Sequence, residues 1–383
     1  MDGRPTICLG LLLLLVSSAS EAAGRTWWVK KDGSGDATVI QEAVDAAAAG
    51  DTIRIGPGRF EEYRPFTTPY WTENVYVLIS TDDLTLIGSG ADATIIGPPQ
   101  VIYGYGEYPY GLLTKLDAVE SLRVRNLRME NNRYNLVGEC HYLEVDSCTF
   151  SGGGLGLMTT ADLGSRIRDC TFSDLRDGMG THEPARDILI AGCTFRDSGI
   201  GITLWLTTAA RVERCDFFGG REGIEIQQYS EATVSNCRFS VARYAIVITL
   251  YSSVALHDNV VLGSVVSLSG IDMVSIQASG NVFGPGSYAT TEFGLGIPTL
   301  NGNHILKGGG PSVKLGGYSR PPLASFDFTG NYWGTTSADS IAAWIHDHND
   351  DPAIQAYVLF EPFSTVPLPV QQKTLGGIKG MFR

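Results

Sequence analysis

One tripeptide, Cys-x-Phe, returns five times along the middle of this chain at an almost constant pitch, and this repeat strongly constrains the fold. Successive cysteines stand 22, 23, 22 and 22 residues apart: Cys148, Cys170, Cys193, Cys215 and Cys237. Asparagine then continues the series at the same pitch, with one longer loop before the last: Asn259, Asn281, Asn303 and Asn331. Asn126 stands 22 residues before Cys148. Self-similarity at a fixed period of this length indicates a solenoid.

The second half of each repeat separates the two solenoids that share this pitch, the leucine-rich repeat and the right-handed parallel β-helix. A leucine-rich repeat returns through a helix or a 3₁₀ segment with spaced leucines. Here the returning segments read "GIGITLWL", "EGIEIQQY" and "YAIVITLY", and apolar residues alternate with others at the period of a strand. The sequence therefore predicts an all-β, right-handed parallel β-helix with three short strands in each coil of about 22 residues.

Stacking of coils at about 4.8 Å places one residue type in a row along the axis. Asparagine tolerates the left-handed turn conformation and can hydrogen-bond its stacked neighbours, so an asparagine ladder is expected. Cysteine at the same position is expected to pack as a small buried hydrophobe. Disulfides within the row are the less favoured alternative, because stacked parallel neighbours seldom offer the required Cβ directions. A row also cannot surround a metal ion tetrahedrally.

Both ends of the solenoid carry a predicted cap. At the first end, Thr38 is the expected N-cap of a helix and Gln41 completes a capping box. The apolar face of that helix comprises Val39, Ile40, Ala43, Val44 and Ala47. At the other end, "SADSIAAWIHDHNDD" predicts a short helix before a last strand in "AYVLFEPF", with one face formed by Ile341, Trp344, Ile345 and His348. Capping of both ends is what a solenoid requires.

The sequence divides into three predicted parts. Residues 1–23 combine Arg4, a short apolar run and small residues, which is typical of a secretory signal peptide. Residues 25–363 form the β-helix, and residues 364–383 form a Pro-containing tail that is either disordered or a sorting signal. A secreted location, extracellular, periplasmic or at the cell surface, is therefore expected, without a transmembrane segment.

The net charge of the chain indicates which kinds of binding partner are expected. The sequence holds 41 Asp and Glu against 28 Lys and Arg, a formal net charge of −13. An acidic chain repels phosphate backbones, so nucleic acid is not expected as a partner. No motif in the sequence identifies a cofactor, so the cofactor is left open.

Two stretches carry a family resemblance. The segment "DGSGDATVIQEAVDAAAAGDTIRIGPGRFEE" resembles the opening of secreted pectinesterase-like and pectate-lyase-like proteins. The "CTF" coils and "TGNYWGTTSAD" resemble bacterial secreted right-handed parallel β-helix repeat proteins of the pectin-lyase-like superfamily. This resemblance covers nearly all of residues 25–363 and implies the fold. It implies no single activity, because the superfamily includes lyases, hydrolases, esterases, epimerases, binding proteins and adhesins. The sequence has neither the motif runs of the pectinesterases and polygalacturonases nor the "WIDH" element of many pectate lyases.

Counting from each cysteine predicts which side chains face outward on the long parallel sheet. Position nine is the inward row, formed by Met179, Ile202, Ile224 and Ile246. Position ten is outward and comprises Met158, Gly180, Thr203, Glu225 and Val247. Position twelve is also outward and comprises Thr160, His182, Trp205, Gln227 and Thr249, with Tyr229 and Tyr251 two residues further on.

These rows define the candidate site. A ring at Trp205 beside Gln227, flanked by Tyr229 and Tyr251, suits a surface that stacks on sugar faces and hydrogen-bonds hydroxyls. The alternative is that the rings pack under the tyrosine-rich loop at residues 101–111. Neighbouring turns place Arg176 beside Asp177, Arg221 beside Glu222, and Arg243, which indicates either a salt-bridged rim or a grip on carboxylated sugars.

His182 and Glu225 are the candidate acid/base residues of this surface. They lie two coils apart, roughly 10 Å along the axis, without the close carboxylate pair of a glycosidase. No metal site is predicted, because His346 and His348 in "HDHNDD" diverge on the expected helix. The predicted function is a secreted or envelope protein that binds a polysaccharide or cell-surface glycan. The alternative is a polysaccharide-degrading enzyme, a lyase or a glycoside hydrolase.

Overall fold

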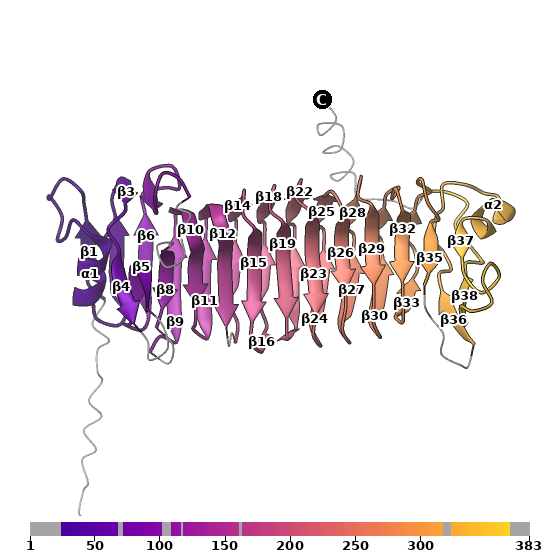
Figure 1. Cartoon of the computed structure of the whole chain (residues 1–383), viewed down its shortest axis with the longest axis horizontal. Helices are drawn as coiled ribbons and strands as arrows, with labels where there is room; N and C mark the ends of the chain where they lie inside the picture. The colour runs from indigo at the N-terminus through magenta and orange to yellow at the C-terminus, as the bar shows by residue number, and fades with distance from the viewer. Residues whose placement is uncertain are drawn as a thin grey trace, which may run out of the picture.

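The chain winds into a rod of stacked coils whose strands run side by side along its whole length (Figure 1). The computed structural model describes residues 24–67, 72–101, 109–115, 118–160, 163–316 and 323–367. The proposed signal peptide and most of the proposed tail lie outside these residues. Within them, neither helix is long and apolar enough to cross a membrane.

Each coil adds one strand to a twelve-stranded parallel sheet on one side of the rod. Its strands, in order, are β1 (Thr26–Val29), β2 (Thr52–Ile55), β6 (Leu84–Gly88), β9 (Ser121–Arg125), β11 (Tyr142–Asp146), β13 (Arg166–Arg168), β17 (Leu189–Ala191), β21 (Ala210–Glu213), β24 (Glu231–Ser235), β27 (Ser253–His257), β30 (Ser275–Ser279) and β33 (Ile297–Leu300). We refer to it as the first sheet.

A second row of short strands follows the turn after the first sheet. Its members are β3 (Gly58–Phe60), β7 (Thr94–Ile96), β14 (Thr171–Ser173), β18 (Thr194–Arg196), β22 (Asp216–Phe218), β25 (Arg238–Ser240), β28 (Val260–Val261), β31 (Val282–Phe283) and β34 (His304–Ile305). Two longer strands, β10 (Arg128–Gly138) and β12 (Thr149–Thr160), run through this row into the next.

The third row, which we call the face sheet, carries the candidate site. Besides β10 and β12 it comprises β5 (Thr72–Ile79), β8 (Tyr110–Thr114), β15 (Asp177–His182), β19 (Ile200–Trp205), β23 (Glu222–Gln227), β26 (Tyr244–Ile248), β29 (Val266–Gly270), β32 (Ala289–Phe293), β35 (Val313–Leu315) and β37 (Ile345–His346). The remaining strands are β4 (Arg64–Thr67), β16 (Ala185–Arg186), β20 (Thr207–Thr208), β36 (Ala324–Asp327) and β38 (Ala356–Leu359).

The cysteine and asparagine rows form one continuous ladder, as predicted. Asn259 Nδ2 donates to Asn281 Oδ1 at 2.9 Å and to the Val234 carbonyl at 2.8 Å. The cysteines repeat this pattern with sulfur, since Cys237 Sγ accepts from the Cys215 amide at 3.4 Å. The six described cysteines, the five of the ladder and Cys140, are buried as free thiols, which confirms their expected role as packing residues.

Asn126 does not belong to this ladder, contrary to the spacing argument. The register pairs Arg125 with Asp146, so Leu127, not Asn126, is equivalent to Cys148. The left-handed conformation also falls one residue before the ladder, at Asn126 (φ 54°) and at Ser147 (φ 53°). Asparagine thus occurs in the ladder for its hydrogen bonds, and the turn conformation belongs to the preceding residue.

Next to the ladder, the phenylalanines of the Cys-x-Phe repeat stack in the centre of the rod. Their ring centroids are 4.6–4.9 Å apart and nearly parallel through Phe150, Phe172, Phe195, Phe217 and Phe239. All five are buried. Offset-stacked rings at this separation add to the free energy gained from burial, so the tripeptide provides both a ladder residue and a core residue to each of these five coils.

The N-terminal cap is a helix, as expected, but the capping box is wrong. Helix α1 (Ile40–Ala46) begins after Val39, which makes no side-chain cap hydrogen bond. The Gln41 amide instead donates to the Leu78 carbonyl at 3.0 Å and accepts from the Leu78 amide at 2.7 Å. Gln41 therefore satisfies the backbone of strand β5, and tertiary contact outweighs the local capping pattern.

The C-terminal cap is shorter than the pattern indicated. Helix α2 (Ala338–Ala342) is capped by Ser337, whose hydroxyl accepts from the Ser340 amide at 3.2 Å. Ile345 lies in β37, and His348 lies in the following loop, where Nδ1 contacts the Ile354 carbonyl at 2.7 Å. The expected last strand is β38, paired with β36. The apolar spacing here reflects a strand after a helix, not one longer helix.

Candidate functional site

The face sheet turns its side chains inward and outward as the count from the cysteines predicts. The inward row is fully buried, with Met179, Ile202, Ile224 and Ile246 at 0–1% exposure. The outward row pairs strand by strand through Gly180, Thr203, Glu225 and Val247. Parallel pairing therefore places residues of neighbouring coils side by side on one rigid surface.

This outward row continues beyond the part that the sequence count identified. From Val247 it runs on in register through Ser269, Glu292, Lys314 and His346. Ser269 is ten residues after Asn259, but Glu292 and Lys314 are eleven after their asparagines, because one more residue separates the ladder from the face sheet in those two coils. Extending the count past the last cysteine would have found Ser269, and the strand register was needed for the others.

Two ring pairs lie on or beside this surface. The His182 and Trp205 rings are 5.1 Å apart and tilted by 34°, with His182 exposed and Trp205 half-buried. Gln227 is the strand partner of Trp205. Tyr229 and Tyr251 stack at 5.1 Å and 7°, at 61% and 49% exposure. The structure thus pairs two of the three predicted rings, Tyr229 and Tyr251, with each other, and pairs Trp205 with His182, which was predicted as an acid/base residue.

The two tyrosines are not strand residues, although the count placed them on an outward row. Strand β23 ends at Gln227 and β26 ends at Ile248. Tyr229 and Tyr251 follow in left-handed turns, with φ of 59° and 63°. They therefore lie where the face sheet ends and the chain turns toward the first sheet.

Glu225 is the carboxylate nearest the middle of the outward row. Burial raises its pKa, the negative charges of Glu222 and Asp177 raise it further, and Arg221 opposes them. His182 lies two strands away, on β15, and no contact joins it to Glu225. The two proposed acid/base residues therefore share a surface without forming a pair.

The arginines at the edge of the face sheet are engaged with neighbours. Arg176 pairs with Asp177 at 2.9 Å and Arg221 with Glu222 at 3.2 Å. The Arg243 guanidinium lies 4.8 Å from the centre of the Tyr244 ring. The interpretation of a salt-bridged rim is thus confirmed for the first two arginines.

At its N-terminal end the outward side of the face sheet is closed by packing. Val75, Leu78, Leu113 and Val137 form a separate buried cluster there, covered by Phe66, Tyr110, Tyr134 and Met158. Tyr110 and Tyr134 stack at 5.2 Å, and burial raises the pKa of Tyr110 to about 12, against the effect of Arg133. Residues 102–108 of the tyrosine-rich loop lie outside the described residues. The partly exposed stretch of the outward row, which we call the open part of the face, therefore begins beyond β12, and it is interrupted at Val247 and Ser269, which are buried.

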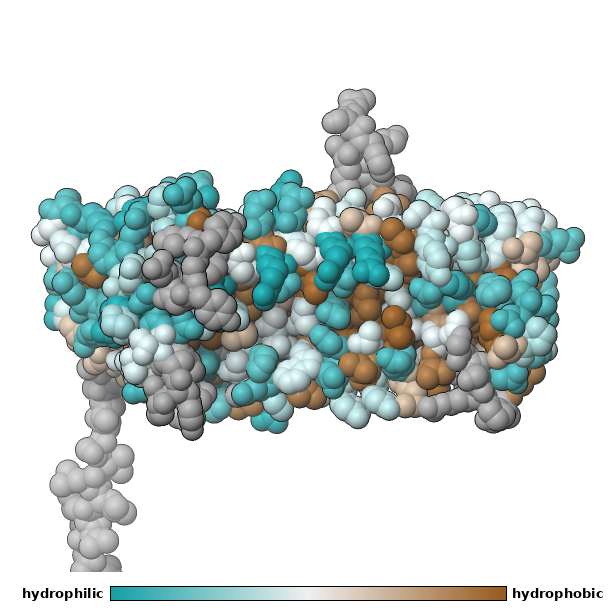
Figure 2. All heavy atoms as spheres, viewed as in Figure 1, coloured by the Kyte–Doolittle hydropathy of each residue, from teal (hydrophilic) through white to brown (hydrophobic). Residues whose placement is uncertain are grey.

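Surface hydropathy changes along the open part. In the view that faces the strands of this sheet, hydrophobic surface gathers around β23, β26 and β29, beside strongly hydrophilic surface (Figure 2). Ile271, which follows β29, is 41% exposed, and Leu250 is half-buried. A mixed apolar and polar surface of this kind suits ligands that have both ring faces and hydroxyls.

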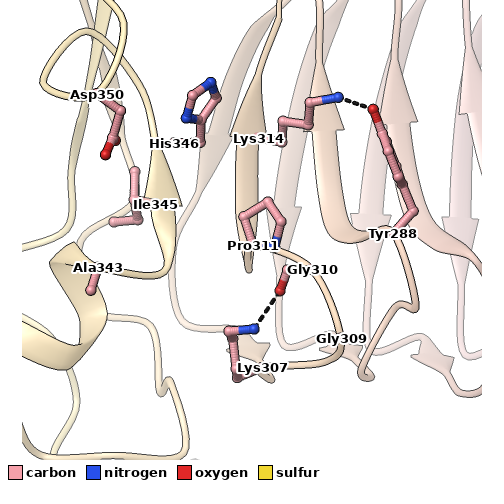
Figure 3. Close-up of a pocket in the computed structure, with 10 residues that line it drawn as sticks. All are labelled: Tyr288, Lys307, Gly309, Gly310, Pro311, Lys314, Ala343, Ile345, His346 and Asp350. Carbon is pink, nitrogen blue, oxygen red and sulfur yellow. Dashed lines mark hydrogen bonds between the residues drawn. The ribbon is translucent and has the colours of Figure 1, made fainter.

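The outward row ends in a pocket of about 510 Å³ at the C-terminal end of the rod. Its walls include Tyr288, Lys307, Pro311, Lys314 and His346 (Figure 3). Lys314 Nζ donates to the Tyr288 hydroxyl and, at 3.3 Å, to Glu292 Oε1. Partial burial disfavours its charge, but these two hydrogen bonds raise the pKa of Lys314 overall. The ammonium is therefore held as a cation at a fixed place.

The "HDHNDD" segment next to this pocket has structural roles. Asp347 is buried, and its carboxylate accepts from the Asn349 and Val358 amides, both at 2.9 Å. The His348 ring packs 4.8 Å from the Tyr357 ring. Across the described ranges, no group of three or more His, Cys, Asp or Glu side chains is placed to hold a metal ion.

The chain belongs to the family described as the right handed beta helix region, which matches residues 135–283 and again 181–332, together more than half of its length. No curated protein matches the sequence. The fold and the family thus define a class of solenoid, and the outward surface has to be interpreted from its own residues.

Solved structures with the same winding include enzymes and a phage protein. The Azotobacter vinelandii mannuronan C-5 epimerase A-module is 14% identical, with 78% of this chain and 82% of that chain covered and a TM-score of 0.45. The catalytic unit of a GH87 alpha-1,3-glucanase from Streptomyces thermodiastaticus is 11% identical, over 86% and 65%, with a TM-score of 0.48. Tailspike protein 3 of bacteriophage CBA120 is 12% identical, over 86% and 59%, with a TM-score of 0.36. These likenesses concern the fold alone.

Proposed function

We propose that this protein binds a carbohydrate chain along the outward surface of the face sheet. The observation that carries the proposal is the His182–Trp205 ring pair, which lies on two adjacent strands with Gln227 as the next residue in the row. Rings offer flat apolar surface to the faces of sugars, and amides bond the hydroxyls between them.

The rigidity of the surface supports an extended ligand. The ring pair and the outward row are held by in-register parallel strands, so a chain lying along the axis meets preordered contacts. Preordered contacts lose little conformational entropy on binding. Secretion, which the first 23 residues predict, would place this surface where polysaccharides and cell-surface glycans occur.

Cleavage of the bound chain, by a lyase or a hydrolase, is the second candidate. Glu225 favours it, because burial raises the pKa of this carboxyl group, and a raised pKa is what a carboxylic general acid needs. His182 has no contact with Glu225, so a pair of residues acting together is not evident. Binding without cleavage is therefore the proposal that the geometry supports better.

The first test compares two tryptophan variants on a panel of purified polysaccharides. Trp205→Ala should weaken binding by about 1–3 kcal/mol, by analogy with ring-stacked bases, which is roughly fivefold to 150-fold in Kd. Its thermal stability should change little, since Trp205 lies outside the main core cluster. Trp28→Ala is the matched control, because Trp28 is exposed on β1 of the first sheet.

The outcomes separate the alternatives. Equal affinity of Trp205→Ala and the unaltered protein for the best polysaccharide would overturn the proposed surface. A large loss of thermal stability would show that Trp205 is packed as a structural residue. Release of reducing ends or unsaturated products, lost in Glu225→Gln, would select the enzyme over the binding protein.

A further inference from the structure

We propose that the pocket at the C-terminal end of the face sheet, the end pocket, binds the terminal residue of a carbohydrate chain through an anionic group on that residue. This inference rests on the proposed function, because the end pocket would hold the last sugar residue of the carbohydrate chain that the face sheet binds. The ligand class is a sugar residue that carries a carboxylate or a sulfate.

The position of the end pocket is the first argument. Among the described strands, β37 pairs with β35 alone and is the last strand of the face sheet. Ala343, Ile345 and Asp350 then form one wall, opposite the turn at residues 307–311 (Figure 3). A chain that follows the outward row toward this end therefore meets a wall, and the pocket is where its last residue would lie.

Two ammonium groups with remaining donors are the second argument. Lys307 Nζ donates to the carbonyls of Gly308 at 2.8 Å and Gly310 at 2.6 Å. Lys314 Nζ donates to Tyr288 and Glu292. An ammonium has three N–H donors, so each lysine is fixed by two hydrogen bonds and keeps a third for a ligand. The two lysines lie on opposite sides of Pro311 (Figure 3), so one of them would hold the anionic group and the other would donate to a hydroxyl of the same sugar.

The rest of the lining suits the remainder of a sugar. His346 and Asp350 offer polar groups for hydroxyls, and Pro311 and Ile345 offer apolar contact. The volume of about 510 Å³ lies within the usual range of small-molecule pockets. Since the protein carries a formal charge of −13, attraction of an anion must come from local cations such as these two.

The test uses monosaccharides, because the end pocket should bind a single residue whether or not the ring surface binds a polymer. Glucuronate, glucose 6-sulfate and glucose are titrated into the full chain, and the Lys307 and Lys314 variants are compared by calorimetry or ligand-observed NMR. Glucuronate or glucose 6-sulfate should bind at least about tenfold tighter than glucose. Which of the two binds tighter identifies the anionic group.

The variants locate the site. Lys314→Met and Lys307→Met should each weaken binding of the anionic sugar about tenfold or more, because a charge-assisted hydrogen bond is lost. Lys314→Arg should recover part of it. Lys115→Met, at an exposed lysine outside the end pocket, is the matched control and should have no effect.

Three results would overturn the inference: equal affinity for glucose and for both anionic sugars, no binding of any of them, or unchanged affinity in both lysine variants. Failure of the proposed function would give a different result. Polymer binding would then be the same in Trp205→Ala and in the unaltered protein, whereas binding of the anionic monosaccharide would still depend on the two lysines. Circular dichroism and thermal melting of each lysine variant exclude unfolding as the cause of a loss.

Discussion

Glu225 is a residue of the face sheet whose surroundings raise the pKa of its carboxyl group. It is half-buried on the outward row, and the nearest charges, apart from Arg221, belong to Glu222 and Asp177. Because burial and these carboxylates raise its pKa, the folded protein holds the proton more tightly than the unfolded chain does. The contribution of Glu225 to stability is therefore complete below its unfolded-state pKa and is lost as pH rises through the folded-state pKa.

Glu225→Gln removes this titration and should change the pH dependence of stability. Relative to the unaltered protein, the variant should gain melting temperature as pH is raised from about 4 to about 7. Thermal melts across that range measure the difference. Glu231→Gln, at an exposed glutamate of the first sheet, serves as the control. Parallel curves for Glu225→Gln and the unaltered protein would show that its carboxyl titrates alike in both states.

At the scale of elements, the ladder shows how two unlike side chains fill one position. Asn281 Nδ2 donates to the Leu256 carbonyl at 2.9 Å, and Asn281 Oδ1 accepts from the Asn259 amide at 2.9 Å. Cys237 Sγ donates to the Val212 carbonyl at 3.6 Å and accepts from the Cys215 amide. Sulfur repeats both contacts weakly, so the thiol part of the ladder relies more on packing.

This difference predicts an order of stability among ladder variants. Asn281→Ala leaves a buried amide and a buried carbonyl without their side-chain partner, at about 1–3 kcal/mol each. Asn281→Cys should cost less, because sulfur keeps weak versions of both contacts. Cys193→Ala, in the thiol part, should also cost less than Asn281→Ala. Urea denaturation midpoints measure the order, and equal losses for the two Asn281 variants would show that ladder hydrogen bonds contribute little.

At the scale of the whole molecule, the rod depends on how its first coil is closed. Strand β4 pairs with the first half of β5, as far as Val75. Gln41 of α1 then satisfies both backbone groups of Leu78 further along the same strand. The edge strand β5 is thus covered along one half by β4 and along the other half by α1. An uncovered edge would be open to pairing with a strand of another molecule.

Gln41→Leu should therefore destabilise the rod and expose an edge. Loss of the two hydrogen bonds to the buried Leu78 backbone should cost about 1–3 kcal/mol for each group left unsatisfied. Partial self-association should accompany it and is measurable by sedimentation velocity. Glu42→Ala, at an exposed position of the same helix, is the control. A monomeric, equally stable Gln41→Leu protein would show that α1 covers the edge without this amide.

The repeat made most of this architecture predictable, because a 22-residue count assigns the coil, the ladder, the inward row and the ring pair together. Local patterns failed where tertiary contacts decide. The predicted capping box at Thr38 does not form, because Gln41 hydrogen-bonds instead to Leu78, which is 37 residues away in the sequence. The end pocket could not be predicted, because one additional residue between the ladder and the face sheet shifts Glu292 and Lys314 out of the count. Its far wall also comes from residues 343–350.

The regular stacking of coils also makes the rod a ruler. Trp205 on β19 and Lys314 on β35 are separated by five strand steps, roughly 24 Å at the usual parallel spacing. Only a ligand long enough to cover that interval can touch both places at once. Cys237 and Asn259 occupy equivalent positions in successive coils. Removal of residues 237–258 would therefore delete one coil, shorten the interval by one strand step and leave both ends intact. The number of coils between Trp205 and Lys314, not the chemistry at either place, would then set the length of the shortest ligand that can bind both at once.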